Sequence, residues 1–193
     1  YFELVMQTAA KGLREFMEGK PLSVKIYEME KPDVPLWCVW AIQQYAKEAG
    51  KERCRKLYMG LIRDIVDYLL ASKHPNLTLD TNGLLYADAK GEAITWMNSM
   101  NNGQPVVPRS GYIVELNALW YNALRFTAAM EMESGNEERA NELDALAEKC
   151  KVSFVETFLN EYGYLYDYVD GRMVDWSVRP NMVFAVALDY SPL

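Results

Sequence analysis

The chain contains few of the residues on which common catalytic centres are built. It has one histidine, His74, and three cysteines, with no Cys-x-x-Cys pair. This composition excludes the usual nitrogen and sulfur ligands of a zinc site, and a Ser-His-Asp or Cys-His relay would have to use His74, around which no motif stands. We therefore expect no metal and no cofactor. Any chemistry must use carboxylates, amides, arginines and aromatic rings.

Long apolar runs and clusters of positive charge are also missing. No apolar run approaches the roughly 20 residues that span a bilayer, and the net charge is −7 with basic residues scattered singly. The sequence therefore predicts neither membrane insertion nor a nucleic-acid partner. Cys38, Cys54 and Cys150 are expected to be small buried residues in a reducing compartment, which favours a cytoplasmic protein.

The apolar periodicity is helical along most of the chain. We expect helices at about 2–17, 34–49, 52–72, 113–133 and 137–158, and a last one beginning near Pro180. Short extended segments are expected at Leu84-Leu85-Tyr86 and Tyr164-Leu165-Tyr166. Consecutive helices pair as antiparallel hairpins, joined by loops that carry polar and aromatic side chains. The predicted fold is all-α, a partial (α/α)6 toroid with about six of the twelve helices.

The two ends of the chain favour the interpretation that it is a piece of a larger protein. The chain begins at Tyr1 without an initiator methionine and ends at Leu193 directly after an apolar run. We interpret residues 1–193 as a single partial domain. Half a toroid would expose its inner face, so a homo-oligomer formed through that face fits this interpretation.

The stretch from Ile94 to Leu124 places aromatic rings among polar side chains. These side chains are Trp96, Asn98, Arg109, Glu115, Asn117, Trp120, Tyr121 and Asn122. A pyranose offers apolar C–H faces to aromatic rings and hydroxyls to amides, carboxylates and guanidinium groups, so the mixture predicts a sugar-binding cleft. A buried helix would rarely contain both Asn117 and Asn122 without a ligand or a network to satisfy them. Trp96 is either buried packing or a stacking platform, and Glu115 lies in a first turn where the helix dipole favours a carboxylate.

Two flanking segments supply further candidate residues. Asp33 precedes a helix with proline in its first turn, where it is an N-cap that could also bind a hydroxyl at a cleft mouth. Trp37 shares a helical face with Trp40, so core packing is expected for at least one of them. Arg179 and Asn181 flank Pro180 after a loop, and both are free to point into a cleft.

Two aspartate pairs have simpler interpretations. Asp64 and Asp67 weakly resemble a metal-binding pair but are expected on a solvated helix face. Asp167 and Asp170 precede Gly171 and are expected to be turn formers.

Three segments together resemble the amylo-α-1,6-glucosidase domain of glycogen debranching enzymes. They are Asp33–Trp37, then Thr95–Met97 through Pro108-Arg109 to Val114–Asn122, then Gly163–Asp167 through Arg179–Asn181 to Ser191–Leu193. The similarity covers most of the chain from about Asp33 onward, in the order and spacing of the family. It implies an (α/α)6 toroid that removes α-1,6-linked glucose from glycogen or limit dextrin with inversion. The residues that would shape the glucose site are Asp33, Trp37, Trp96, Arg109, Asn117, Trp120, Tyr121, Asn122, Arg179 and Asn181.

One position departs from the family pattern. An inverting glycosidase uses two carboxyl groups about 6.5–9.5 Å apart, one as acid and one as base. In the family the acid is an Asp directly after Trp-Met, whereas this chain has Asn98, and the family's base would lie beyond Leu193. An amide cannot donate a proton as a carboxylic acid does. Either another carboxylate acts, with Glu115 the nearest candidate in the motif, or the protein no longer hydrolyses.

We therefore predict one wall of the cleft of a debranching α-1,6-glucosidase domain, inactive as an isolated chain. One alternative is a catalytically dead glucan-binding module that keeps the site without the acid. A second is a helical scaffold for protein partners, which would carry its aromatic residues on an outer patch.

Overall fold

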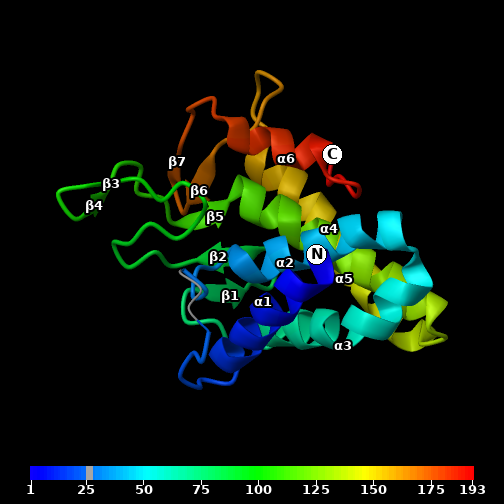
Figure 1. The fold of residues 1–193 in the computed structure, drawn as a ribbon. Coiled ribbons are helices and arrows are strands. Elements are labelled where there is room, and N and C mark those ends of the chain that lie inside the picture. The colour runs from blue at the N-terminus through cyan, green and yellow to red at the C-terminus, as the bar shows by residue number, and fades with distance from the viewer. Residues whose placement is uncertain (25–27) are drawn as a thin grey trace.

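The chain folds into a layer of helices with a small sheet at one end. The computed structural model describes residues 1–24 and 28–193 (Figure 1). Its helices are α1 Phe2–Met17, α2 Val34–Ala49, α3 Lys51–Leu70, α4 Val114–Glu133, α5 Glu137–Phe158 and α6 Phe184–Ala187, with the 3-10 helix η1 Pro180–Val183 leading into α6. The helical periodicity of the sequence is thus confirmed, with ends that differ by only one or two residues.

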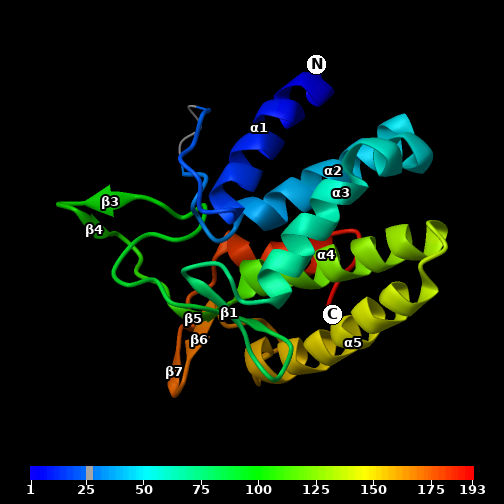
Figure 2. The ribbon, with the colours of Figure 1, turned by 90° about the horizontal axis from the view of Figure 1, so that it is seen from below.

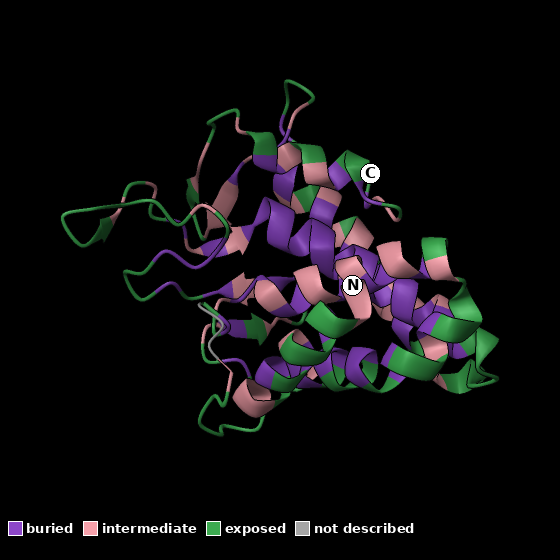
Figure 3. Cartoon of the chain, viewed as in Figure 1, coloured by how far each residue is buried: buried purple, intermediate pink, exposed green. Residues whose placement is uncertain are grey.

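Helix α4 lies at the centre of the fold. It packs along α5 and also contacts α2, α3, η1 and α6 (Figure 2). Because neighbours surround it, almost the whole helix is buried and no solvated stripe runs along it (Figure 3). The polar side chains of α4 must therefore find partners inside the protein.

The hairpins form as the apolar stripes predict. α2 and α3 turn back on each other at Gly50, whose φ is 87°, and α1 packs against α3. On α5 the apolar residues Leu143, Ala147, Cys150, Phe154 and Phe158 form one buried stripe. On α3, Leu61, Ile65 and Leu69 are buried, whereas Leu57 is 50% exposed and lies in the groove between α1 and α3.

A five-stranded antiparallel sheet shows that the all-α class was wrong. Its strands are β1 Leu77–Leu79, β2 Leu85–Ala87, β5 Gly111–Ile113, β6 Tyr168–Asp170 and β7 Met173–Val174, in the order β1-β2-β5-β6-β7. A separate hairpin joins β3 Met100–Asn101 to β4 Gln104–Pro105. Each strand has only two or three residues, too few to show an alternating pattern in the sequence. The expected extended segment at 84–86 overlaps β2, whereas Leu165 forms only an isolated bridge with Leu159.

The sheet determines which loops meet. β5 runs directly into α4, and β6 pairs with β5 so that Tyr112 faces Val169. This pairing brings Asp167, just before β6, to the first turn of α4, where the Val114 amide donates to its carbonyl at 3.1 Å. Segments more than fifty residues apart thus meet at the sheet end of the helices (Figure 1).

The three cysteines lie in helices α2, α3 and α5. Cys54 and Cys150 are buried and Cys38 is half-buried, all three as free thiols, and burial raises the pKa of each. Within residues 1–24 and 28–193, every helix is too short or too polar to cross a bilayer.

Gly111 provides a test of the sheet contact. Its φ is 88°, and a Cβ there would clash with the Val169 carbonyl oxygen and lie 2.9 Å from Asp170 Cα. We expect Gly111→Ala to lower the free energy of unfolding by about 3 kcal/mol or more, measured by urea denaturation. Gly91→Ala is the matched control, because Gly91 has a φ of 82° with open space around it. Its loss should be about 1 kcal/mol, and equal losses would contradict the proposed clash.

Candidate functional site

The centre of the candidate site is a buried arginine between two carboxylates. Arg109 donates from Nη1 and Nη2 to the two oxygens of Glu115 at 2.6 and 2.5 Å. Its Nε lies 2.9 Å from Asp167 Oδ2, and Nη2 also donates to the Asp167 carbonyl at 3.3 Å. All three side chains are at least 96% buried. The arrangement joins the loop before β5, the first turn of α4 and the segment before β6.

The charge of the buried guanidinium is compensated by direct contact with the two carboxylates. Burial opposes the charge of Arg109, but the hydrogen bonds that it donates to Glu115 and the charges of Glu115 and Asp167 raise the pKa of the guanidinium. A two-pronged arginine–carboxylate contact also holds both groups in one orientation. Glu115 is therefore held by Arg109 with both oxygens occupied and no solvent exposure. This geometry suits a residue that positions Arg109.

Asp167 links this centre to the segment around η1. Asn181 Nδ2 donates to Asp167 Oδ1 at 2.6 Å, and Arg179 Nη1 donates to Asp167 Oδ2 at 2.8 Å. Arg179 also reaches Asp175 at 2.9 Å. The expectation that Asp167 only forms a turn is wrong, because its buried carboxylate accepts hydrogen bonds from Asn181 and Arg179 and forms an ion pair with Arg109. Its place in the Gly163–Asp167 segment of the family pattern was the one sequence signal for this role.

Trp96 is held in place by the same network. Its indole Nε1 donates to Asn181 Oδ1 at 3.1 Å, and its backbone N–H donates to Asp33 Oδ2 at 2.8 Å. The ring remains 46% exposed. It lines a hollow of about 350 Å³ formed by Trp96, Met97, Ser99, Val106 and Val107. The structure therefore favours a platform over a buried packing role for Trp96.

A row of aromatic rings backs Trp96. Phe184 packs edge-on against Trp96 and Trp37 with centroid distances of 6.2 and 5.2 Å, and Trp37 packs against Trp40 at 5.7 Å. Trp37 Nε1 donates to Asp33 at 3.2 Å. Trp37 is thus part of the packed support of the hollow, as its spacing from Trp40 indicated.

Asp33 occupies the N-cap position of α2 without capping the helix through its side chain. Its carboxylate instead accepts hydrogen bonds from Trp37 and Trp96. Burial raises the pKa of Asp33 to about 6, against the lowering effect of these hydrogen bonds, and the charge of Glu115 adds to the rise. A perturbed carboxyl next to an exposed ring is common at functional sites.

Asn98 lies exposed two residues after Trp96. Its Nδ2 donates to both oxygens of Glu28, at 3.1 and 3.0 Å. Glu28 is also exposed and has a left-handed backbone, with a φ of 59°. No sequence signal singled out Glu28, since it lies outside the three segments whose residues resemble the family. The amide at position 98 is therefore in contact with a carboxylate from a distant segment.

Four polar and aromatic residues of α4 belong to the core: Asn117, Trp120, Tyr121 and Asn122. Asn117 bonds the backbone of Leu85 in both directions, with Oδ1 2.7 Å from its nitrogen and Nδ2 3.0 Å from its oxygen. Asn122 exchanges two amide hydrogen bonds with Gln43, at 2.8 and 3.3 Å. Trp120 and Tyr121 are also buried, and Trp120 Nε1 donates to the Gly83 carbonyl at 3.1 Å. Hydrogen bonds within the protein thus satisfy Asn117, Asn122 and the Trp120 indole, and none of the four side chains lines the hollow.

Other groups lie away from this centre. His74 is buried between the rings of Phe16 and Tyr68, and burial lowers its pKa to about 4. Asp64 and Asp67 pair with Arg14 and Arg139 on the surface. Within the described ranges, three or more His, Cys, Asp or Glu side chains never gather in a geometry that could hold a metal ion.

Arg109 provides a stability test of the site. Arg109→Met would leave Glu115 and Asp167 buried without their shared cation, which we expect to cost about 3–5 kcal/mol of unfolding free energy. The control is Arg125→Met, because Arg125 pairs with Asp144 and Glu148 on the surface and should lose no more than about 1 kcal/mol. Urea denaturation at pH 7 measures both. Similar losses would show that the buried contacts do not hold the site together.

The family comparison agrees with the resemblance noted in the sequence. The family profile described as Amylo-alpha-1,6-glucosidase matches residues 25–193, which is most of the chain. A search of curated proteins gives no match. The chain belongs to the amylo-alpha-1,6-glucosidase family.

Proposed function

We propose that these residues form one wall of the glucan-binding cleft in a debranching-type α-1,6-glucosidase. The family is one of glycoside hydrolases, and its substrate class is α-glucan. The observation that carries the proposal is Trp96, a half-exposed ring fixed by Asp33 and Asn181 at the edge of a hollow. The six helices of the described residues, among them the α2–α3 and α4–α5 hairpins, would supply about half of a twelve-helix (α/α)6 toroid. A homo-oligomer through the inner face and a cytoplasmic location stay predictions.

The proposed cleft wall combines a rigid ring with polar groups beside it. A glucose unit would place its C–H face on Trp96, since aromatic rings offer a flat apolar surface. The amide of Asn98, two residues after Trp96, and the carboxylate of Glu28, which that amide contacts, are both exposed and can meet hydroxyls. Asp33 and Asn181 are already engaged by Trp96, so they hold the platform and leave hydroxyl binding to the exposed groups.

The carboxylates of the site support binding better than hydrolysis by residues 1–193 alone. Glu115 and Asp167 are neutralised by Arg109, and Asp167 also by Arg179. The position that follows Trp-Met is an amide, which cannot protonate a glycosidic oxygen. We therefore propose that the isolated chain binds α-glucan and releases no glucose. The carboxylate that acts as general base would be supplied from outside these residues. If Glu115 were the acid, it would first have to leave Arg109.

Asn98 favours a second candidate, a glucan-binding module without hydrolytic activity. In this case the complete domain would also be inactive, because its acid position holds an amide that is hydrogen-bonded to Glu28. The two candidates share the binding wall and differ only in turnover. Binding and hydrolysis must therefore be measured separately.

The binding wall can be tested with Trp96→Ala. We expect calorimetric titration with an α-1,6-branched maltooligosaccharide to show binding by the wild type. The affinity of the variant should be lower by a factor of about ten or more. Met132→Ala is the matched control, because Met132 is 44% exposed at the far end of α4. Its affinity should equal that of the wild type. Unchanged affinity in Trp96→Ala would refute the proposed wall.

The acid position can be tested with Asn98→Asp in the complete protein. A general acid contributes about 100-fold or more to rate, so we expect a rise of that order in glucose released from limit dextrin. The new carboxyl would lie against Glu28, and repulsion between the two should raise the pKa of one of them. Activity falls at high pH when the acid at position 98 loses its proton. Adding Glu28→Gln removes the repulsion, so the pKa of this acid should drop and the fall in activity should occur at lower pH. Wild-type hydrolysis that disappears in Glu115→Gln, with folding intact, would instead identify Glu115 as the acid.

A further inference from the structure

A second group of aromatic rings lies outside the hollow, on two loops near the C-terminal part of the chain. We call it the tyrosine–tryptophan cluster, formed by Tyr162, Tyr164, Tyr166 and Trp176. Trp176 packs edge-on against Tyr166 at a centroid distance of 4.7 Å and against Tyr162 at 5.9 Å. Tyr162 and Tyr164 have ring planes only 19° apart, with centroids separated by 6.3 Å. Tyr162 is 70% exposed and Trp176 is 42% exposed.

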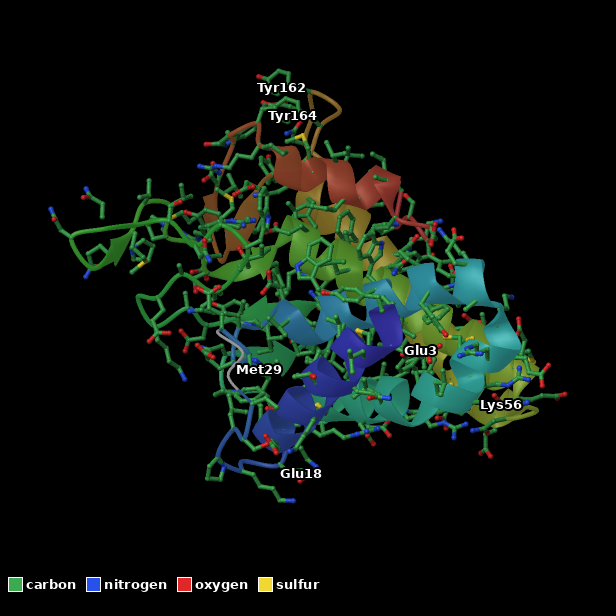
Figure 4. The ribbon with its side chains drawn as sticks, viewed as in Figure 1. Glu3, Glu18, Met29, Lys56, Tyr162 and Tyr164 are labelled. Carbon is green, nitrogen blue, oxygen red and sulfur yellow. The ribbon has the colours of Figure 1, made fainter. Side chains whose placement is uncertain are left out.

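The loop that carries Tyr162 and Tyr164 is held by hydrogen bonds of Asn160, through both its side chain and its backbone. Asn160 is buried, and its Oδ1 accepts hydrogen bonds from the amides of Tyr162 and Tyr164 at 3.0 and 3.3 Å. The backbone N–H of Asn160 in turn donates to the Tyr164 carbonyl at 2.9 Å. Figure 4 shows both tyrosines projecting from the outer tip of this loop. The rings are therefore presented to solvent by a closed turn.

An exposed group of rings held in this way points to a ligand. Contiguous apolar surface on a protein marks an interaction site more often than isolated exposed residues do. Three of the four rings carry hydroxyl groups, and the cluster combines flat faces with polar edges. This combination matches a pyranose, which has C–H faces and hydroxyl edges, better than it matches an aliphatic protein surface.

The cluster is continuous with the candidate site. Trp176 follows Asp175, which accepts a hydrogen bond from Arg179, and Arg179 contacts the buried Asp167. The Ser177 amide donates to Asp175 Oδ1 at 2.7 Å, which fixes the loop around Trp176. A ligand bound at the cluster would therefore rest on a segment anchored in the same network as Trp96.

We propose that the tyrosine–tryptophan cluster is a second α-glucan site, which binds an unbranched stretch of the polymer by stacking while the branch lies at the Trp96 hollow. The choice of α-glucan as ligand rests on the proposed function, whereas the existence of the platform rests on the exposed rings. Two separated contacts on one polymer would raise its apparent affinity through effective concentration. Long glucans would gain from the cluster, and short branched oligosaccharides would not.

The test uses native gel electrophoresis of the chain through gels that contain glycogen, together with calorimetric titration of maltoheptaose. We expect the double variant Tyr162→Ala with Trp176→Ala to bind both about tenfold more weakly than the wild type. Tyr162→Phe, which keeps the ring and removes one of the three hydroxyl groups, should lose less affinity than the double variant. Val152→Ala is the control, since Val152 is 57% exposed on α5. Thermal unfolding shows whether the variants remain folded.

The outcomes separate this proposal from the function proposed above. Equal retardation of wild type and double variant, or no retardation of the wild type, would overturn the cluster as a glucan site. Self-association of the wild type that the double variant abolishes, with glycogen binding unchanged, would show a protein interface instead and would also overturn it. Glycogen retardation that depends on the cluster but not on Trp96 would support the second site even if the Trp96 and Asn98 tests fail.

Discussion

The contact of Arg109 with Glu115 and Asp167 is the interaction on which the rest of the site depends. It places one cation between two carboxylates from separate segments, all with almost no exposed surface. Removing charges from water is costly unless they are paired, so each of these groups requires the others. Through Asp167 the contact orients Asn181, and through Asn181 it orients the ring of Trp96. The half-exposed ring of Trp96 is thus supported by a buried ionic centre.

The mixture of aromatic and polar residues between Ile94 and Leu124 performs two different tasks. Trp96 and Arg109 belong to the candidate cleft, where one ring is exposed and its support is buried. Asn117 and Asn122 instead join α4 to β2 and to α2 through hydrogen bonds in the core. A central helix with neighbours on every side needs such internal partners, because none of its faces is open to water. In the sequence alone, polar residues that would bind a sugar cannot be told apart from polar residues that pair with each other in the core.

Much of the fold could be predicted from the sequence, because helical periodicity is a local property. The helices at 2–17 and 34–49 agree with the structure residue for residue. The sheet could not be predicted in this way, since its strands are short and β5 pairs with β6 across the whole α4–α5 hairpin. In the site, the family pattern indicated Arg109, Asn181 and Trp96. The role of Asp167 and the contact of Glu28 with Asn98 arise from segments far apart in the chain.

The sequence by itself determined the helical hairpins, the family and the amide at position 98. These follow from local periodicity and from the residues present at each position of a motif. Only the tertiary structure decided that Glu115 is held by Arg109, that Asn98 meets Glu28, and that the amides of α4 serve the core. The physical reason is that the role of a polar side chain depends on its partners and its distance from water. Both are set when distant segments pack together.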